Sequence, residues 1–292
     1  MEIEARLHAL SARVGRALDV WLPAEQLQPG MLHKAMRYAA LGGGKRMRPA
    51  LVYATGTALG SPLDSLDGVA CSVELIHAYS LIHDDLPAMD DDDLRRGRPT
   101  SHVRHGEDVA ILAGDGLFAE AVNLLSSEQD GEPANVVAAL RCLAAATGVG
   151  GMVGGQYLDV TQGDEVDAAG LRRLHELKTG RLIAASVLVP LHLAGTSEAA
   201  TLPYRSYAEE LGVLFQIVDD ILDVTGSDAE LGKPHGSDER HGKLTYVSLF
   251  GLERARELAA ESFGKAQREL AAIEGDTHDL ELITNFIHTR QT

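Results

Sequence analysis

Apolar residues recur every three or four positions along most of the chain, which is the periodicity of an α-helix with a buried face. Between residues 66 and 85 this stripe runs through Val69, Val73, Ile76 and Ser80. Similar patterns occupy five further segments, at 107–127, 134–147, 170–195, 203–225 and 244–272. Strict alternation of apolar and polar residues is absent from the sequence, as are hairpin signals between β-branched runs. The pattern therefore predicts an all-α protein.

The breaks between these segments are short and polar, at 129–133, 161–164, 195–203 and 274–278. None resembles a linker between domains, so we expect a single domain spanning residues 1–292. One break is much longer than the others. It spans residues 226–243 and contains four glycines and Pro234. A long glycine-rich loop in a compact helical domain is more often functional than not.

The composition is that of a globular protein, with 45% hydrophobic and 24% charged residues among 292. The net charge of −17 argues against binding to nucleic acid or to an anionic membrane, because both require a basic face. An anionic substrate would therefore need metal ions or clustered Arg and Lys at one place. Cys71 and Cys142 predict free thiols in a reducing compartment rather than a disulfide framework or a zinc site.

No targeting segment or membrane span is apparent in the sequence. The N-terminus is acidic where a signal peptide is basic, and no apolar core region follows it. The longest apolar run, at 182–194, contains Pro190 and His192 and falls short of the ~20 residues that span a membrane. We therefore expect a soluble cytoplasmic protein.

Six aspartates lie between residues 84 and 93, directly after an apolar helical segment. A solvated charge run is the alternative, but carboxylates crowded at the end of an apolar helix repel one another unless a cation lies among them. Mg²⁺ suits such a site, because it takes one or two carboxylates together with substrate phosphates. Pro87 must bend the backbone between Asp84 and Asp90, which could bring Asp90 back beside Asp84. His77, seven residues earlier, shares the helix face of Asp84.

A second acidic group interrupts the apolar segment 203–225. Asp219 and Asp223 are four residues apart, so they point from one side of a helix. Gln216 and Asp220 lie about 40° apart around the helix axis, and Asp223 lies on the same side of the helix. The alternative is that these aspartates face solvent, as acids four residues apart on a helix usually do. Their position within an apolar helix favours a second metal-facing site.

A glycine-rich basic motif, GGGKRMRP, occupies residues 42–49. It is not a P-loop, because Lys45 is followed by Arg46 where Ser or Thr belongs. The glycines nevertheless let the backbone approach a ligand closely. Lys45, Arg46 and Arg48 can then donate charge-assisted hydrogen bonds to a diphosphate.

Further lysines could supply a second basic site. Lys178, with Thr179 and Gly180, interrupts a helical segment, and Lys233 and Lys243 lie in the long loop, although each could be a plain surface residue. The sequence has no Ser-His-Asp arrangement with a nucleophile elbow and no candidate Cys-His pair. Two acidic sites and two basic sites suggest metal-assisted loss of a diphosphate, with a second diphosphate held nearby.

In combination these motifs resemble the trans-isoprenyl diphosphate synthase family, particularly its bacterial farnesyl diphosphate synthases, from about residue 30 to the C-terminus. The resemblance is carried by three motifs. Asp84-Asp85-x4-Asp90 resembles the first aspartate-rich motif of the family, and Asp219-Asp220-x-x-Asp223 resembles the second. Residues 43–49 match the isopentenyl diphosphate motif.

The resemblance implies a role for each matching residue. The Mg²⁺ ligands would be Asp84, Asp90 and Asp219, with Asp85, Asp220 and Asp223 nearby. The diphosphate of isopentenyl diphosphate would be bound by Lys45, Arg48, His77 and Arg96. The allylic diphosphate would be bound by Arg95, Lys178, Lys233 and Lys243. The groups that face the allylic cation would be Thr179, Gln216 and the carbonyl region of Lys178.

The resemblance also implies a fold, a reaction and a product. The family fold is an all-α, single-domain bundle of the isoprenoid synthase type around one deep cavity, assembled as a homodimer. The reaction would join isopentenyl diphosphate to dimethylallyl or geranyl diphosphate by ionisation, condensation and elimination. It would use three Mg²⁺ per active site, with Mn²⁺ as an alternative ion. Tyr79 and Ser80 would set the cavity depth and limit the product to farnesyl diphosphate, with geranylgeranyl diphosphate as the alternative.

Three other functions compete with this interpretation. A terpene cyclase ionises the same substrates, but it would leave the motif at 42–49 without a purpose, and the aromatic content is only 4%. A catalytically inactive partner subunit predicts eroded aspartate motifs, whereas both are intact. A helical interaction module leaves the paired acidic and basic sites unexplained.

Overall fold

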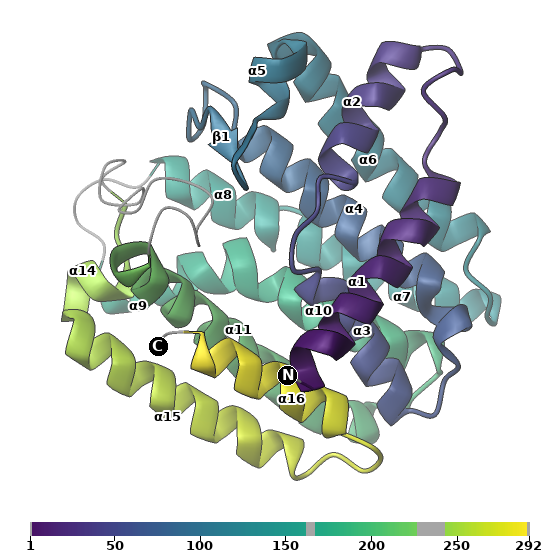
Figure 1. Cartoon of the computed structure of the whole chain (residues 1–292). Helices are drawn as coiled ribbons and strands as arrows, with labels where there is room; N and C mark the ends of the chain where they lie inside the picture. Colours follow the sequence, from purple (N-terminus) through teal and green to yellow (C-terminus); the bar gives the residue numbers. More distant parts are fainter. Residues whose placement is uncertain (1, 162–166, 227–242, 291–292) are drawn as a thin grey trace.

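Two helices that are buried on almost every side form the centre of the molecule, α3 (Met47–Ala58) and α4 (Asp67–Asp84) (Figure 1). Both are apolar around most of their circumference, which is expected of helices enclosed by other helices. The computed structural model describes residues 2–161, 167–226 and 243–290. Within these ranges the buried apolar side chains form one continuous core.

The other elements surround this central pair. In chain order they are α1 (Glu2–Trp21), α2 (Gly30–Ala40), the 3₁₀ turn η1 (Leu63–Leu66), β1 (Leu94–Arg95), β2 (Arg98–Pro99), α5 (Ser101–His105), α6 (Glu107–Ser127), α7 (Pro133–Thr147), α8 (Met152–Thr161), α9 (Ala168–His175), the π-helical turn η2 (Glu176–Gly180), α10 (Arg181–Leu193), α11 (Glu198–Thr225), α14 (Tyr246–Phe250), α15 (Leu252–Leu270) and α16 (His278–Thr289). The all-α prediction is confirmed.

Three predicted segments are single helices close to the predicted bounds, namely α4, α6 and α7. The predicted break at 195–203 is too long. Ser197 caps α11 by accepting a hydrogen bond from the backbone N–H of Ala200, and the helix continues through Pro203. The predicted segment 244–272 is divided at Gly251, whose φ of 80° ends α14 before α15 begins.

Two features were not predicted. Helix α1 packs into the core through Leu7, Leu10, Val14 and Leu18, which recur every three or four residues. The antiparallel pair β1 and β2 lies directly after the aspartate cluster, and its turn contains Arg96 in the left-handed region, with a φ of 54°. Both strands have two residues, which is too short for an alternating pattern to be visible.

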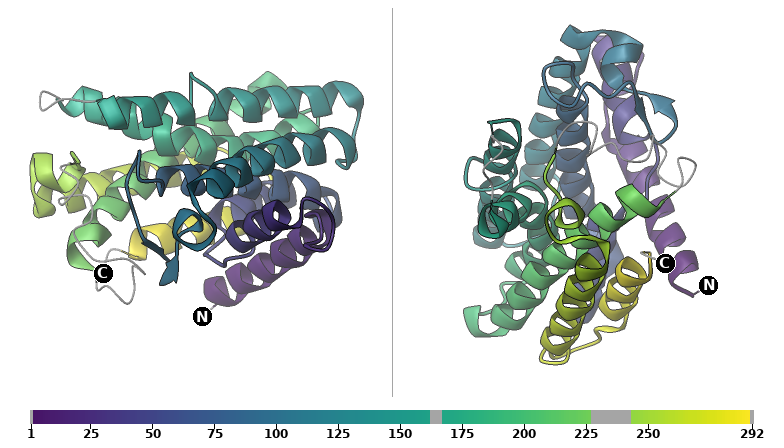
Figure 2. Two further views of the ribbon diagram at one scale, coloured as in Figure 1. Left: turned by 90° about the horizontal axis from the view of Figure 1, so that it is seen from above. Right: turned by 90° about the vertical axis from the view of Figure 1, so that its left-hand side faces the viewer.

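Helices α6 and α7 leave many apolar side chains uncovered. Figure 2 places α7 on the far side of the bundle from α1. By length and composition alone, residues 107–127 and 133–161 could each cross a membrane. In each segment only 39% of an apolar stretch of 18 residues is buried within the protein. The exposed apolar residues of this region are Ile111, Leu112, Phe118, Val122, Val137, Val149, Val153, Tyr157 and Val160. This apolar surface is more extensive than scattered single residues and indicates a contact with another molecule.

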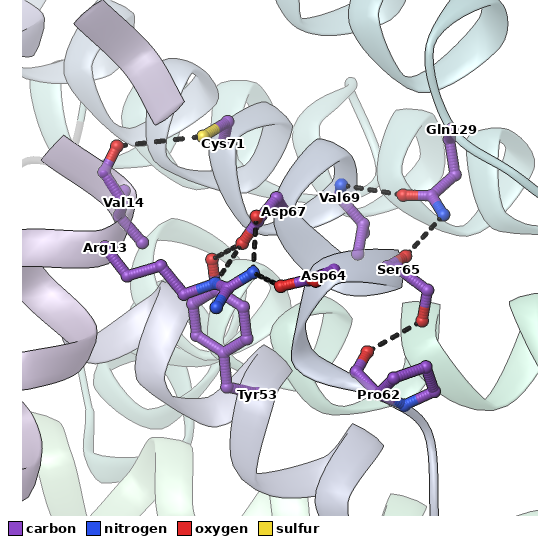
Figure 3. Close-up of polar contacts among 10 residues, drawn as sticks. All are labelled: Arg13, Val14, Tyr53, Pro62, Asp64, Ser65, Asp67, Val69, Cys71 and Gln129. Atoms are coloured by element: carbon purple, nitrogen blue, oxygen red, sulfur yellow. Dashed lines mark hydrogen bonds and ion pairs between the residues drawn. The ribbon is translucent and has the colours of Figure 1, made fainter. Parts of the chain in front are cut away.

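A polar cluster fixes α1 to the two central helices (Figure 3). Arg13 on α1 donates to both carboxylate oxygens of Asp67 on α4, over 2.6 and 2.7 Å. The hydroxyl of Tyr53 on α3 donates to Asp67 Oδ1 over 2.5 Å. Tyr53 is fully buried, so its hydroxyl needs an acceptor within the protein. Asp67 therefore joins three helices.

Replacing Asp67 by Ala should lower the free energy of unfolding by about 2 to 4 kcal/mol, because the Tyr53 hydroxyl and Arg13 both lose their partner. Urea unfolding measures this change. Asp64→Ala is the matched control: Asp64 also pairs with Arg13, but its side chain is 92% exposed, so its removal should cost less than about 1 kcal/mol. Equal losses in the two variants would contradict the role of Asp67.

Candidate active site

A cavity of about 720 Å³ opens at the end of α4. Its wall contains residues of both aspartate motifs, the basic motif and the predicted chain-length position. The predicted residues that line it are Arg48, His77, Tyr79, Ser80, Asp84, Arg95, Arg96, Lys178, Thr179, Gln216 and Asp219. The predicted central cavity is therefore present, and residues from widely separated parts of the sequence meet in it.

The first aspartate motif folds back on itself as predicted. Helix α4 ends at Asp84, and the backbone N–H of Asp90 donates to the Asp84 carbonyl oxygen over 2.9 Å. Burial and the negative charge of Asp90 together raise the pKa of Asp84 to about 6, against the lowering effect of the nearby cations. A half-buried carboxylate beside a second carboxylate favours a bound cation.

Asp85 has a different environment from Asp84. It is buried, and it accepts two contacts from Arg95 on β1, at 2.7 Å from Nε and 2.5 Å from Nη2. It does not line the cavity. In this structure Asp85 holds β1 against the end of α4, and thereby orients Arg95 toward the cavity. Its predicted role near the metal stays a prediction.

The lysines predicted for the allylic diphosphate gather around one carboxylate that sequence reasoning missed. Lys178 Nζ donates to Asp159 Oδ2 over 2.6 Å, and Lys243 Nζ lies 3.4 Å from the same oxygen. Lys243 also donates to Asp90 Oδ1 over 2.8 Å. These pairs connect α8, η2 and the first aspartate motif. Lys233, the fourth predicted ligand of this diphosphate, lies outside the described residues.

The π-helical turn η2 presents Lys178 and Thr179 to the cavity, at the point where the sequence predicted an interruption. Two glycines allow neighbouring helices to approach this turn. A Cβ added to Gly155 on α8 would lie 2.2 Å from the backbone nitrogen of Lys178, and one added to Gly212 on α11 would lie 3.0 Å from Gly180. Larger residues would push the turn out of place.

The second aspartate motif contributes one carboxylate to the cavity wall. Asp219 lines the cavity and is exposed, whereas Asp220 and Asp223 are buried. Asp220 accepts hydrogen bonds from Gln216 Nε2 and from the backbone N–H of Tyr246, both over 2.7 Å. Asp220 thus fixes the amide of Gln216, which faces the cavity. As metal ligands, Asp220 and Asp223 stay predictions.

The basic motif divides its cations between the cavity and the core. Arg48 lines the cavity, and its Nη1 donates to His77 Nε2 over 3.4 Å. Arg46 has a φ of 50° at the start of α3, is buried, and forms an ion pair with Glu74. The prediction that Arg46 donates to a diphosphate is therefore wrong. Its guanidinium is needed inside the protein to neutralise Glu74.

Crowded positive charge distinguishes this end of the cavity. Burial lowers the pKa of Arg48 and Arg96, which line the cavity, and of Lys45, which does not line it. Nearby cations also lower the pKa of each of the three. Burial and the adjacent guanidiniums also hold the pKa of His77 well below its usual range, so its imidazole is neutral. Among the described residues, the buried Nε of Arg48 has no hydrogen-bond partner. An anion bound here would stabilise the charged form of each cation and could accept a hydrogen bond from Arg48 Nε.

The C-terminal helix supplies residues that carried no sequence signal. The Nζ of Lys45 lies 6.0 Å from the ring centroid of Phe286 on α16. Arg290 Nη2 lies 3.8 Å from Asp219 Oδ1, and its guanidinium covers the ring of Phe215. Asp159 could have been found as a lone acid in an apolar helix. Arg290 could not, because only the fold brings it beside Asp219.

The described residues contain no group of three or more His, Cys, Asp or Glu side chains arranged to hold a metal by themselves. This arrangement fits Mg²⁺, which keeps several waters and completes its shell with substrate phosphates. The residues that could contribute oxygen ligands are Asp84 with Asp90 from the first aspartate motif, and Asp219 from the second.

Comparisons with known proteins agree with this geometry. The family described as Polyprenyl synthetase matches residues 29–278. The farnesyl diphosphate synthase of Escherichia coli is 45% identical over 99% of both chains. A heterodimeric geranylgeranyl pyrophosphate synthase large subunit of Arabidopsis thaliana is 43% identical over 95% of this chain and 76% of its own. A geranyltransferase of Helicobacter pylori, solved with magnesium and isoprenyl diphosphate, superposes with a TM-score of 0.83 at 33% identity, covering 97% and 96% of the two chains.

Asp84→Asn should stabilise the magnesium-free protein at pH 8. Because the folded-state pKa is raised from 3.8 to about 6, the ionised carboxylate destabilises the fold above pH 6, and this cost is absent below pH 4. Removing the charge should raise Tm by a few degrees, corresponding to at most about 3 kcal/mol. Thermal unfolding in a chelator measures it.

Asp91→Asn is the control, because Asp91 is exposed in the same cluster and Asn tolerates its φ of 53°. Its Tm should change by less than about 1 °C. With Mg²⁺ and inorganic diphosphate present, Asp84→Asn should instead have the lower Tm of the two variants, since only this variant loses a metal ligand. If Asp84→Asn has a lower Tm than the native protein in the chelator, this account is contradicted.

Proposed function

Because the chain belongs to the polyprenyl synthetase family, we propose that it is a magnesium-dependent farnesyl diphosphate synthase that extends allylic diphosphates with isopentenyl diphosphate. The chain is a trans-prenyltransferase, since it shares 45% identity with a farnesyl diphosphate synthase over nearly its whole length. One observation carries the proposal: Asp84 and Asp219, from the two aspartate motifs, line one cavity together with Arg48 of the basic motif.

The two diphosphates occupy opposite charge environments in that cavity. Isopentenyl diphosphate binds at the cationic end, to Lys45, Arg48 and Arg96, with neutral His77 as a hydrogen-bonding neighbour. This assignment is supported by the lowered pKa of all three cations, which an anion would restore. The allylic diphosphate binds between the aspartate motifs, where Arg95, Lys178 and Lys243 already lie beside carboxylates.

Asp84, Asp90 and Asp219 would hold Mg²⁺ together with the allylic diphosphate, with three ions as the family implies. When bound, Mg²⁺ neutralises the diphosphate and makes it a better leaving group. The raised pKa of Asp84 supports this site, because a divalent cation offsets the cost of its charge. Mn²⁺ has the same preference for oxygen ligands and can replace it.

The reaction breaks the carbon–oxygen bond of the allylic substrate and forms a carbon–carbon bond to the isopentenyl double bond. Thr179 and Gln216 line the cavity between the two diphosphate sites, and their oxygens stabilise the allylic cation. Gln216 is held for this by Asp220. A proton then leaves the new product toward the departing diphosphate. The apolar lining excludes water, which would otherwise trap the cation.

The length of the product is set by the depth of the cavity below Asp84. Tyr79 lies five residues before Asp84, about 7.5 Å along α4 at 1.5 Å per residue. Its side chain is buried, it lines the cavity, and burial raises its pKa to about 12, so the phenol is neutral. Ser80 beside it donates to the His77 carbonyl oxygen over 2.9 Å. A ring at this depth supports farnesyl diphosphate as the product, with geranylgeranyl diphosphate as the alternative.

The active form is a homodimer in which a second copy covers the apolar side of α6. Leu112 and Phe118 on this helix are 56% and 40% exposed. Asp115 and Glu120 in the middle of the same helix would be costly in hydrocarbon, which favours protein over lipid as the partner. Light scattering should give twice the 31.2 kDa mass of the chain, and a monomer at micromolar concentration would contradict the dimer.

The enzyme acts in the cytoplasm, as one polyprenyl synthetase domain over residues 1–292. Free thiols at Cys71 and Cys142 support a reducing compartment. Cell fractionation tests the location.

Product analysis tests the function directly. Purified protein with Mg²⁺, isopentenyl diphosphate and geranyl diphosphate should form farnesyl diphosphate, identified by chromatography after dephosphorylation. Tyr79→Ala should shift the products toward geranylgeranyl diphosphate, because the lost ring deepens the cavity. Tyr79→Leu is a milder variant if the cavity left by Ala, which costs about 3 to 5 kcal/mol, prevents folding.

Tyr157→Ala is the matched control, since Tyr157 also lines the cavity but is 65% exposed on α8. It should leave the product length unchanged. Release of a hydrocarbon or alcohol without isopentenyl diphosphate would indicate a terpene cyclase instead. An unchanged product from folded, active Tyr79 variants would remove Tyr79 as the floor.

A further inference from the structure

Helices α4 and α6 interlock next to the floor of the cavity. Tyr79 and His83 are four residues apart on α4, and Gly114 and Phe118 are four residues apart on α6. Residues with this spacing lie above one another on one helix face. His83 lies against Gly114, and Tyr79 lies against Phe118. The two pairs run in opposite directions, so the helices meet as antiparallel neighbours.

The ring of Tyr79 is enclosed by two other rings. Its centroid lies 5.7 Å from that of His83 and 5.5 Å from that of Phe118, with interplanar angles of 83° and 80°. Both are edge-to-face arrangements, which aromatic rings prefer to parallel stacking. Tyr79 therefore has one ring on its own helix and one on α6 that limit its rotation.

His83 is fixed independently of Tyr79. Its Nε2 donates to the carbonyl oxygen of Ile111 on α6 over 3.0 Å. A Cβ on Gly114 would lie only 2.2 Å from the same nitrogen, so the absence of a side chain at this position lets the imidazole fit. Of the two rings that enclose Tyr79, His83 is thus held by a hydrogen bond and by close packing. Phe118 is held by packing alone.

Phe118 stands behind Tyr79 rather than in the cavity. It is not among the residues that line the cavity, and within one chain its side chain is 40% exposed on the apolar side of α6, which the proposed dimer would cover. Substrate would therefore not touch Phe118 while Tyr79 is in place. Removing its ring would open space on the side of Tyr79 that faces away from substrate.

We propose that Phe118 is a positioning residue for product length, which keeps the Tyr79 ring across the cavity and so stops elongation. Resting on the proposed function, this inference adds a second layer to the cavity floor, contributed by a different helix. With Phe118 in place, Tyr79 has no room to turn outward. Without it, the ring can rotate into the vacated space, and the cavity deepens although Tyr79 itself is unchanged.

The test compares product lengths of Phe118→Ala, Phe118→Tyr and the native protein, using isopentenyl diphosphate, geranyl diphosphate and Mg²⁺. Phe118→Ala should raise the ratio of twenty-carbon to fifteen-carbon product about tenfold, whereas Phe118→Tyr retains the ring and should give the native ratio. A purely structural role would lower stability and rate but leave this ratio unchanged. Phe118→Leu, which removes the ring but keeps bulk, replaces the Ala variant if that one fails to fold.

Leu112→Ala controls for loss of apolar surface on α6. Leu112 is 56% exposed and lies about 120° around the helix from Phe118, outside the aromatic group. It should give the native product ratio. Folded, active Phe118→Ala or Phe118→Leu with the native ratio, or Leu112→Ala with an equal shift, would overturn the inference. If the native protein forms no prenyl product at all, the proposed function itself fails, which is a distinguishable result.

Discussion

The structure depends on the balance of buried charge around one cavity. Carboxylates from α4 and α11 and cations from four different segments lie around it. Because charges taken out of water destabilise the fold, each group needs a nearby charge of opposite sign to offset that cost. Among the described residues, three cations near the first aspartate motif have acidic partners: Arg95 has Asp85, Lys178 has Asp159, and Lys243 has Asp90. At the opposite end positive charge is in excess. The proposed function assigns a metal-bound diphosphate to the first end and a free diphosphate to the second.

Unusual local backbone delivers these groups, and the surrounding helices hold that backbone in place. Arg46 and Arg96 both have left-handed φ values, which set the direction of the chain at the cationic end. The π-helical turn η2 brings Lys178 and Thr179 to the wall, and close packing against Gly155 and Gly212 maintains it. Strained or irregular backbone is common where a site must present several polar groups to one point.

Much of this site could be predicted from sequence, because the aspartate and basic motifs are local signals. The return of Asp90 to Asp84 followed from Pro87, and the spacing of Gln216 and Asp220 is that of a hydrogen bond within one helix turn. Partners far apart in sequence could not be predicted. Periodicity gave no reason to pair Lys178 with Asp159 or to bring Arg290 to Asp219, and it could not distinguish buried Arg46 from Arg48 at the cavity.

The magnesium dependence of binding to the two ends of the cavity tests the central claim most directly. Calorimetry would compare isopentenyl diphosphate with a non-reactive allylic diphosphate analogue, each with Mg²⁺ and with a chelator. If charge divides the cavity as described, removing Mg²⁺ should weaken the allylic analogue more than about tenfold and isopentenyl diphosphate less than about threefold. Equal dependence of the two ligands on Mg²⁺ would contradict the account.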